Sequence, residues 1–385
     1  MQGIDPAGQA SAAAYSDPFP SVAPVRVLVF ADNYGASQSL AFVEGLAGAR
    51  ARGEAAVRLV EEFAFGPDLG LRDLQAARAL AEAELAQTSP TAVVLSRFGH
   101  SAAAEAIVLA ARARGVPVCV HIDDELFDLP VTAGIERYRG ARHPRRLMAL
   151  QRALQGADLV IAATEPLAER LARRAGHARV GWLQNGTAAR PAPRRSKTPG
   201  EPVVVGYMGS ASHGPDLELV IPALTAVLKR ERNVRVELFG SIARQPAADQ
   251  LPAAVVRHEV VAGDYSAFKR KLANLEWDIG LAPLQATPYN RCKTATKWAE
   301  YAEAGAAVLA SDIEVYRPMF AADAAMPATP FQWEHALQRL IGSPALRAGL
   351  VAAADELLLA RFGWERLEAS VLGLLQQVQP RRAAA

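Results

Sequence analysis

The sequence predicts an α/β protein made of two doubly wound, Rossmann-like domains that face each other across a cleft. Three observations lead to this prediction. Short runs of β-branched and other apolar residues alternate with long stretches rich in Ala, Leu, Arg and Glu. The apolar runs are continuous, as in parallel strands that are buried on both faces. The alternation stops once, in a proline-rich segment, and then resumes.

The predicted elements follow one another in the order of βαβ units. Strands are predicted in the first half at Val25–Phe30, Ala92–Leu95, Val116–Ile122 and Leu159–Ala163. The helices between and after them are Leu71–Gln87, Ser101–Arg114, Pro144–Gln155 and Pro166–Ala175. Strands are predicted in the second half at Val203–Met208, Val234–Phe239, Ile279–Ala282 and Ala307–Ala310. The second half also contains predicted helices over Leu217–Arg230 and, last in the chain, Trp364–Val378.

The proline-rich segment, residues 188–202, contains four prolines and no apolar run, so it is predicted to link two domains. The first domain is then residues 25–187 and the second residues 203–362. Residues 1–24 read as a leader followed by a flexible tail rich in small residues. The last helix, within residues 363–385, is able to pack back on the first domain.

Composition excludes several classes of protein. The 385 residues are 51% hydrophobic and 21% charged, which is ordinary globular usage. A net charge of +2 gives no electrostatic case for nucleic-acid binding. With Cys119 and Cys292 as the two cysteines, neither a disulfide framework nor a cysteine zinc site is expected, and a cytoplasmic location fits. No apolar run reaches the roughly 20 residues of a membrane span. The arginine-rich stretch 137–152 leaves a peripheral membrane contact open, although a solvated helix face is favoured.

The segment from Tyr289 to Gly305 is the richest in candidate site residues. It follows a predicted strand, and Thr294 or Thr296 is expected to cap a helix that ends at Gly305. Six of the 42 basic residues are lysines, and Lys293 and Lys297 lie within one helical turn of each other. Such a helix start with two lysines suits a phosphate group. Glu300, about one turn further on, is placed to accept hydrogen bonds from a ribose diol.

A glycine-rich turn follows the first strand of the second half. Gly209, Ser210 and His213 lie in this turn, where small residues let the backbone approach a ligand and His213 is able to donate to a phosphate or sugar. The turn matches neither GxGxxG nor the Walker pattern, which argues against NAD and P-loop ATP binding.

Two strand ends in the first half supply further candidates. His121, Asp123 and Asp124 end the predicted strand at Ile122, where acidic residues serve as a metal site, as a base for an acceptor hydroxyl, or simply as the acidic first turn of a helix. Tyr34 and Gly35 lie in a small-residue loop after the first strand, and we expect them to border the acceptor.

The order of these motifs resembles the retaining glycosyltransferases of the GT-B fold, the "group 1" class that uses nucleotide diphosphate sugars. The resemblance extends from Val25 to Val378. It rests on the loop after the first strand, Asn185-Gly186, the glycine turn, and Glu300 followed five residues later by Gly305. Two segments look like those of a glycosyltransferase subgroup that is common in bacterial surface-polysaccharide synthesis. They are the segment that contains Lys293 and Lys297, and Pro117…His121-Ile122-Asp123-Asp124.

The resemblance implies that Glu300 binds the donor ribose, that the helix start at Thr294 to Thr296 binds the diphosphate, and that no metal or other cofactor is required. It also implies retention of anomeric configuration, by front-face attack. The sequence departs from the family at Cys292, where the first Glu of a paired-Glu motif falls. It departs again after the glycine turn, where Ser210 and His213 replace Arg and Lys. We therefore expect Lys293 and Lys297 to carry the diphosphate charge.

Three functions remain open at this point. The first is a glycosyltransferase that moves a sugar from a nucleotide diphosphate donor to a saccharide or lipid-linked saccharide acceptor. The second is a sugar-nucleotide epimerase of the same architecture, although only His121 and His213 fall at suitable strand ends. The third is a GT-B-shaped binding subunit without catalysis, which the cysteine at position 292 keeps open. The sugar, the base, the acceptor and the oligomeric state are not predicted.

Overall fold

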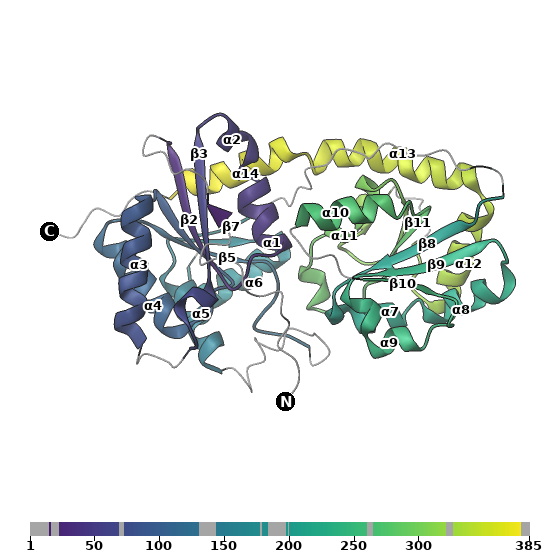
Figure 1. Cartoon of the computed structure of the whole chain (residues 1–385), viewed down its shortest axis with the longest axis horizontal. Coiled ribbons are helices and arrows are strands. Elements are labelled where there is room, and N and C mark those ends of the chain that lie inside the picture. Colours follow the sequence, from purple (N-terminus) through teal and green to yellow (C-terminus); the bar gives the residue numbers. More distant parts are fainter. Residues whose placement is uncertain are drawn as a thin grey trace. The chain divides into compact units, whose positions relative to one another are not determined.

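The computed structural model describes residues 15–16, 23–68, 73–130, 144–177, 179–183, 198, 200–259, 265–320 and 326–378 (Figure 1). These residues divide into two compact units. The first comprises residues up to Leu129, those from Pro144 to Leu183, and the helix that begins at Trp364; the second runs from Thr198 to Gly363. The tail predicted for residues 1–24 and the linker predicted for 188–202 fall mostly outside the described residues, as do Asn185 and Gly186.

The first unit is built on one sheet, with strand order β1-β3-β2-β4-β5-β6-β7. Its strands are β1 (Tyr15–Ser16), β2 (Val25–Ala31), β3 (Ala55–Glu61), β4 (Ala92–Ser96), β5 (Val118–Ile122), β6 (Leu159–Ala162) and β7 (Val180–Trp182). The β1–β3 pair is antiparallel, and the other pairs described in this sheet are parallel. Every residue of β4 and β5 is buried, which explains why these strands read as continuous apolar runs.

Helices cover both faces of this sheet. They are α1 (Ala36–Gln38), the π-helix η1 (Ser39–Glu44), α2 (Ala47–Ala51), the 3-10 helix η2 (Glu62–Phe65), α3 (Leu74–Thr88), α4 (Ser101–Ala113), α5 (Pro144–Gly156), α6 (Glu165–Ala175) and α14 (Trp364–Gln376). The β2–β3 connection packs with α14 over one face, where Phe42 and Leu46 share a core with Leu367 and Val371. Helices α3 to α6 pack one against the next, and right-handed crossovers put them on the other face.

The second unit has a sheet of parallel strands in the order β10-β9-β8-β11-β12. The strands are β8 (Val203–Met208), β9 (Val234–Phe239), β10 (Val256–His258), β11 (Ile279–Ala282) and β12 (Ala307–Ala310). Around them lie η5 (Ala211–His213), α7 (Gly214–Glu218), α8 (Ile221–Arg230), η6 (Ser241–Arg244), α9 (Pro246–Asp249), α10 (Tyr265–Asn274), η7 (Asn290–Cys292), α11 (Thr296–Glu303), η8 (Arg317–Met319), α12 (Pro330–Gly342) and α13 (Pro344–Arg361). One core joins the sheet to α7, α8, α9 and α12, and a second joins it to α10, α11 and α13. No described helix has both the length and the apolar character needed to cross a membrane.

The predicted fold class is confirmed, with local corrections. Strands β1, β3, β7 and β10 were not predicted, and β1 lies in the segment predicted as a flexible tail. Strand β3 follows an Ala- and Arg-rich stretch that reads as helix, and β7 and β10 have only three residues each. The single helix predicted over Leu217–Arg230 is wrong, because the chain forms α7 and then α8. Pro222 lies in the first turn of α8 and has no N–H to continue a helix from α7.

In each sheet, the chain changes the direction in which it adds strands at one central strand. Strand β2 lies between β3 and β4, and β8 lies between β9 and β11. The loops after β2 and β4 therefore diverge at their neighbouring carboxyl ends, as do the loops after β8 and β11. Open α/β sheets bind their ligands outside the strand ends at such a switch point.

Candidate active site

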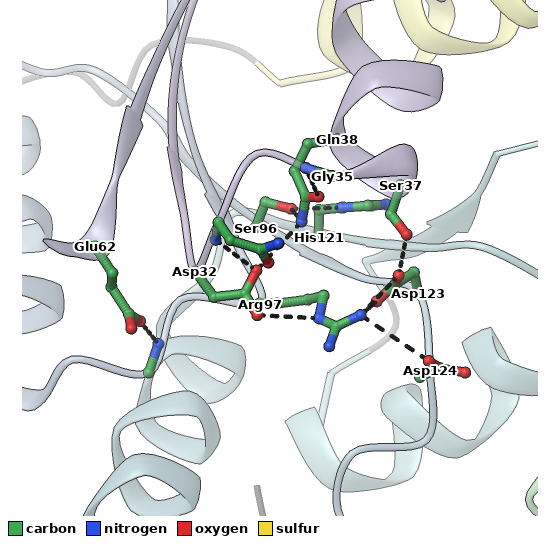
Figure 2. A network of polar contacts seen from close by, with 12 residues as sticks. Asp32, Gly35, Ser37, Gln38, Glu62, Ser96, Arg97, His121, Asp123 and Asp124 are labelled. Atoms are coloured by element: carbon green, nitrogen blue, oxygen red, sulfur yellow. Dashed lines mark hydrogen bonds and ion pairs between the residues drawn. The ribbon is translucent and has the colours of Figure 1, made fainter. Parts of the chain in front are cut away.

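Arg97 is the centre of a polar cluster at the switch point of the first unit. Figure 2 shows three carboxylates directed at its guanidinium group. The nearest guanidinium nitrogens lie 3.4 Å from Asp32, which follows β2, and 3.1 Å and 4.0 Å from Asp123 and Asp124, which follow β5. Arg97 itself follows β4 and has a positive φ of 51°. One partly buried cation therefore joins the ends of three strands, and its left-handed backbone marks a strained turn.

The turn that carries Arg97 is also held by Glu62, from the end of β3. The carboxylate of Glu62 accepts hydrogen bonds from the N–H groups of Gly99 at 2.5 Å and His100 at 3.0 Å. Arg146 of α5 forms an ion pair with the same carboxylate. A side chain at Gly99 would overlap with Arg146, so glycine is required there. The start of α4 is thus already occupied by a carboxylate of the protein.

Asp123 is an ionised carboxylate in this cluster. It accepts a hydrogen bond from the hydroxyl of Ser37 and two at 3.1 Å from Arg97. Burial acts to raise the pKa of Asp123, but the charge of Arg97 and the hydrogen bonds outweigh it and hold the pKa below its ordinary value.

His121 is buried and neutral. Its Nδ1 lies 2.9 Å from the hydroxyl oxygen of Ser96, and Phe42 packs edge-on against its ring with centroids 5.2 Å apart. Burial lowers the pKa of His121 to about 4. Gln38 donates to Ser96 at 3.2 Å and to Asp32 at 3.4 Å, which ties the histidine to the Arg97 cluster. The three predicted catalytic residues, His121, Asp123 and Asp124, therefore lie in one network.

Tyr34 and Gly35 enter the first unit's site through their backbones. The N–H of Tyr34 donates to Glu61 at 2.6 Å, and the N–H of Gly35 donates to the side-chain oxygen of Gln38 at 3.3 Å. The side chain of Tyr34 packs against the core. These bonds fix the loop that presents Ser37, while the acceptor role of the two residues stays a prediction.

The reading of the acidic run as the first turn of a helix is wrong. Residues 123–130 form turns and no helix. Glu125, the third acid of the run, is buried, and its carboxylate lies 3.5 Å from the guanidinium of Arg170. Only Asp123 and Asp124 of this run face Arg97.

The second unit brings Lys293 and Lys297 together with two tyrosines. The Nζ atom of Lys297 lies 4.5 Å above the ring of Tyr207 and 3.4 Å from its hydroxyl oxygen. Lys293 has the same relation to Tyr289, at 4.7 Å and 3.4 Å. Burial lowers the pKa of Lys297 to about 8, opposed by the charges of Asp216 and Glu300. Both ammonium groups thus lie against aromatic faces, which favour the charged form of a lysine.

The helix start beside these lysines differs from the prediction. Helix α11 begins at Thr296 after Ala295, and no side chain caps it. The hydroxyl oxygens of Thr294 and Thr296 instead lie 2.7 Å apart in a hydrogen bond with each other. The first backbone bond of the helix runs from the N–H of Ala299 to the carbonyl of Ala295. No threonine oxygen occupies the N–H groups of the first turn, which suits an external anion.

Glu300 is buried one turn into α11 and is held by Tyr265. The hydroxyl of Tyr265, the first residue of α10, donates to the Glu300 carboxylate at 2.6 Å. Burial raises the pKa of Glu300 to about 7, against the effects of this hydrogen bond and of Lys297. The sequence provided no sign of Tyr265, because the contact joins residues 35 positions apart.

The glycine turn after β8 packs against the turn after β9. Gly240 has a φ of 99°, and a Cβ there would lie 2.5 Å from the carbonyl oxygen of Gly209. Gly209 accepts a hydrogen bond from Ile242 and donates one to Phe239. The hydroxyl oxygens of Ser210 and Ser212 lie 2.7 Å apart at the exposed rim. Close packing of two strand ends thus explains Gly240, and ligand contact by Gly209 and Ser210 stays a prediction.

His213 is paired with Asp216, a residue that the sequence analysis did not single out. The Nδ1 atom of His213 lies 2.8 Å from an oxygen of Asp216. Both residues line a cavity of about 40 Å³ together with Asn290 and Lys293. Burial, with help from Lys297, lowers the pKa of His213 to about 4.

Cys292 lies where the resembling family has a glutamate. Its side chain is buried, with Sγ 3.6 Å from the carbonyl oxygen of Pro288. The thiol therefore packs inside the loop. In the part of the chain that the structure describes, no group of three or more His, Cys, Asp or Glu side chains is arranged to hold a metal ion.

One known family resembles the first unit in sequence. Residues 22–186 match the glycosyl transferase 4-like domain. The match includes Tyr34, Gly35, Arg97, His121 and the two aspartates of the Arg97 cluster. Among curated proteins, none matches the sequence.

Solved structures show the fold of the whole chain. A glycosyltransferase from Rickettsia africae superposes with a TM-score of 0.63 at 11% identity, over 92% of this chain and 98% of that one. HepE of Anabaena, in complex with UDP-glucose, superposes with a TM-score of 0.62 at 13% identity, over 91% and 99%. TarM of S. aureus, in complex with fondaparinux, α-GlcNAc-glycerol and UDP, has a TM-score of 0.55 at 12% identity. This chain aligns over 77% of its length with TarM but spans only 58% of TarM. The fold is GT-B.

Replacing Arg97 tests the cluster that it holds. Arg97→Met removes the guanidinium from the buried Asp32 and the partly buried Asp123, so we expect a loss of roughly 3–5 kcal/mol in the free energy of unfolding at pH 7. In the native protein, the depressed pKa of Asp123 contributes stability that is present above an ordinary pKa of about 3.9 and lost as the pH falls through the folded value. In the variant, burial raises the pKa of Asp123, so protonation at low pH removes the cost of burying its charge. The difference between the two proteins therefore shrinks from pH 7 to pH 4.

Urea unfolding of both proteins at pH 7, 5 and 4 measures this difference. Arg152→Met, at an exposed position of α5, is the matched control and is expected to change stability little. A loss that is equal at all three pH values would show that the carboxylates do not depend on Arg97.

Proposed function

We propose that this protein is a retaining, metal-independent glycosyltransferase of the group 1 class. It moves a sugar from a nucleotide diphosphate donor to a saccharide or lipid-linked saccharide, as in bacterial surface-polysaccharide synthesis. The observation that carries the proposal is the lysine cluster of the second unit. Lys293 and Lys297 lie on tyrosine faces beside the uncapped start of α11, with the buried Glu300 one turn away. The glycosyl transferase 4-like match of residues 22–186 supports it independently.

We assign donor binding to the second unit. Lys293, Lys297 and the first-turn N–H groups of α11 bind the diphosphate, and Glu300 accepts hydrogen bonds from the ribose hydroxyls. Thr294 and Thr296 line this start, while Gly209, Ser210 and His213 approach from β8. The cations stabilise the charge that builds up on the diphosphate as the glycosidic bond breaks. UDP-glucose in HepE and UDP in TarM support a nucleotide diphosphate as the co-substrate.

We assign acceptor binding to the first unit. Asp123 is held ionised by Arg97, and a carboxylate with a depressed pKa accepts a hydrogen bond well but takes up a proton poorly. We therefore infer that Asp123 and Asp124 orient the acceptor hydroxyl, with His121 as a neutral neighbour. The hydroxyl oxygen bonds to the anomeric carbon, the bond from that carbon to the phosphate oxygen breaks, and the departing phosphate receives the hydroxyl proton.

The cation that lies among the carboxylates of the first unit supports metal independence. The guanidinium of Arg97 lies among Asp32, Asp123 and Asp124, where a divalent cation would otherwise neutralise them. Lys293 and Lys297 take the corresponding part beside the diphosphate. A divalent cation is thus needed neither to neutralise these carboxylates nor to neutralise the diphosphate, because we assign both roles to side chains.

Incubation with nucleotide sugars tests the function directly. With UDP-, GDP- and ADP-sugars and a mixture of oligosaccharide acceptors, we expect release of the nucleoside diphosphate that depends on acceptor, a product with the donor's anomeric configuration by NMR, and full rate in excess EDTA. Sugar inversion without acceptor would indicate an epimerase, and binding without release would indicate an inactive subunit. A rate that EDTA abolishes and Mn²⁺ restores would overturn metal independence alone.

Lys297→Ala tests the phosphate assignment. Each charge-assisted contact contributes about 1.5–3 kcal/mol, so affinity for UDP should fall about tenfold or more while affinity for uridine changes little. Glu300→Gln should weaken UDP and uridine alike, because both contain the ribose. Calorimetric titration measures both ligands, and Lys229→Ala, exposed on α8, is the matched control. If Lys297→Ala affects uridine as much as UDP, the assignment is wrong.

Asp123→Asn tests the acceptor side. The amide keeps the shape but loses the charge that orients the acceptor hydroxyl, so we expect turnover to fall by about 10²-fold with UDP affinity unchanged. Asp128→Asn, an exposed carboxylate of the same segment, is the control and should keep its rate. An equal loss of UDP affinity and turnover would instead place Asp123 on the donor side.

A further inference from the structure

The cavity beside Lys293 contains a histidine–aspartate pair whose chemistry the lysines alone do not explain. His213 and Asp216 lie on the short segment between β8 and α8, and with Asn290 and Lys293 they line the cavity of about 40 Å³. That space is far smaller than the roughly 300–1,000 Å³ of a pocket for a whole drug-sized ligand. It suits one small polar group of a larger ligand.

Asp216 is buried and joins its own segment to the loop that contains Gln285 and Asn290. Its Oδ2 accepts from Nδ1 of His213 at 2.8 Å, and its Oδ1 accepts from the backbone N–H of Gln285 at 2.9 Å. The side-chain amide of Asn290 lies 3.4 Å from the same oxygen. Burial acts to raise the pKa of Asp216, but these donors and Lys297 hold it below its ordinary value. Asp216 is therefore an ionised group that can only accept hydrogen bonds.

This bond fixes the tautomer of His213. Because an ionised carboxylate cannot donate, the hydrogen between the two groups belongs to Nδ1. The proton-accepting nitrogen of the neutral ring is then Nε2. Among the described residues, no side chain or backbone group forms a hydrogen bond with that nitrogen. About a fifth of the side chain, 19%, is exposed, so Nε2 is within reach of a ligand.

We propose that Asp216 is a positioning residue that holds His213 so that Nε2 meets a phosphate oxygen of the donor, and that His213 takes up one proton from solvent when the diphosphate binds. The proposal rests on the donor assignment made above and adds to it a coupling between binding and protonation. The proton adds to Nε2, which then donates to the phosphate, while Nδ1 keeps donating to Asp216. No other bond is formed or broken.

The charges around His213 explain why protonation waits for the ligand. Burial and the charges of Lys297 and Lys293 oppose a charged ring, whereas Asp216 favours it. The hydroxyl of Tyr207, from β8, lies 3.5 Å from the backbone carbonyl of His213 and carries no charge near neutral pH. A diphosphate between the ring and the lysines offsets their repulsion and leaves the imidazolium between two anions.

Calorimetric titration of the full chain with UDP, GDP and ADP at pH 6, in two buffers of different ionisation enthalpy, measures protons taken up on binding. Lys297 is already charged at this pH and contributes nothing. We expect the wild-type protein to take up close to one proton more than His213→Gln, and Asp216→Asn to lose most of that excess. His335→Gln, at an exposed position of α12, is the matched control and should behave as wild type. Wild-type affinity should also rise about tenfold relative to His213→Gln between pH 8 and pH 5.5.

Two further readouts separate positioning from a structural role. Nitrogen-15 spectra of histidine-labelled protein should show a single Nδ1–H tautomer at His213 without ligand and a mixture in Asp216→Asn. Affinity for the bare nucleoside should be the same in the wild type and in Asp216→Asn if the site remains folded. Equal proton uptake by wild type and His213→Gln would overturn this inference while UDP binding still supports the proposed function. If none of the three diphosphates binds, both fail.

Discussion

Buried parallel strands must all leave the sheet at the same edge, and the rest of this structure depends on that constraint. Every backbone group within such a sheet is hydrogen-bonded, so side chains that act on a ligand have to lie beyond the strand ends. The order of the strands then determines where along this edge the ligand-binding side chains lie. Asp32 and Arg97 follow the neighbouring strands β2 and β4, and the glycine turn and Gln285 follow β8 and β11. In each unit, the two diverging loops place their polar side chains at the point where the order reverses.

The two clusters differ in the sign of the charged groups that predominate in them. In the first unit, three carboxylates surround one guanidinium, and carboxylate oxygens suit hydroxyl groups as hydrogen-bond donors. In the second unit, two lysines lie on neutral aromatic rings, and the buried Glu300 is held by a tyrosine hydroxyl. An ammonium on a ring keeps its charge available, whereas an ammonium on a carboxylate would already be neutralised. This contrast is the physical basis for assigning the phosphate to one unit and the sugar acceptor to the other.

The sequence predicted what depends on local pattern and missed what depends on contacts between distant residues. Continuous apolar runs located most strands, and the strand ends at His121, Gly209 and Lys293 led to both clusters. Arg97 was missed although it directly follows a predicted strand, because its importance comes from carboxylates on two other strands. Asp216 and Tyr265 were missed for the same reason. The threonine cap was wrong since the two hydroxyl groups bond to each other, which residue type alone does not reveal.

Helix α14 has a consequence for how the protein is made. Its residues Leu367, Val371, Leu374 and Leu375 complete the core of the first unit, yet the ribosome synthesises them after the whole of the second unit (Figure 1). At about 5–20 residues per second, the roughly 180 residues that separate Leu183 from α14 take about 10–35 seconds to translate. During that time Phe42 and Leu46 lack their final covering, and chaperones have a defined apolar surface to bind. The second unit, whose segments are nearly contiguous, is complete first. The domain that begins the chain is thus the last to finish folding.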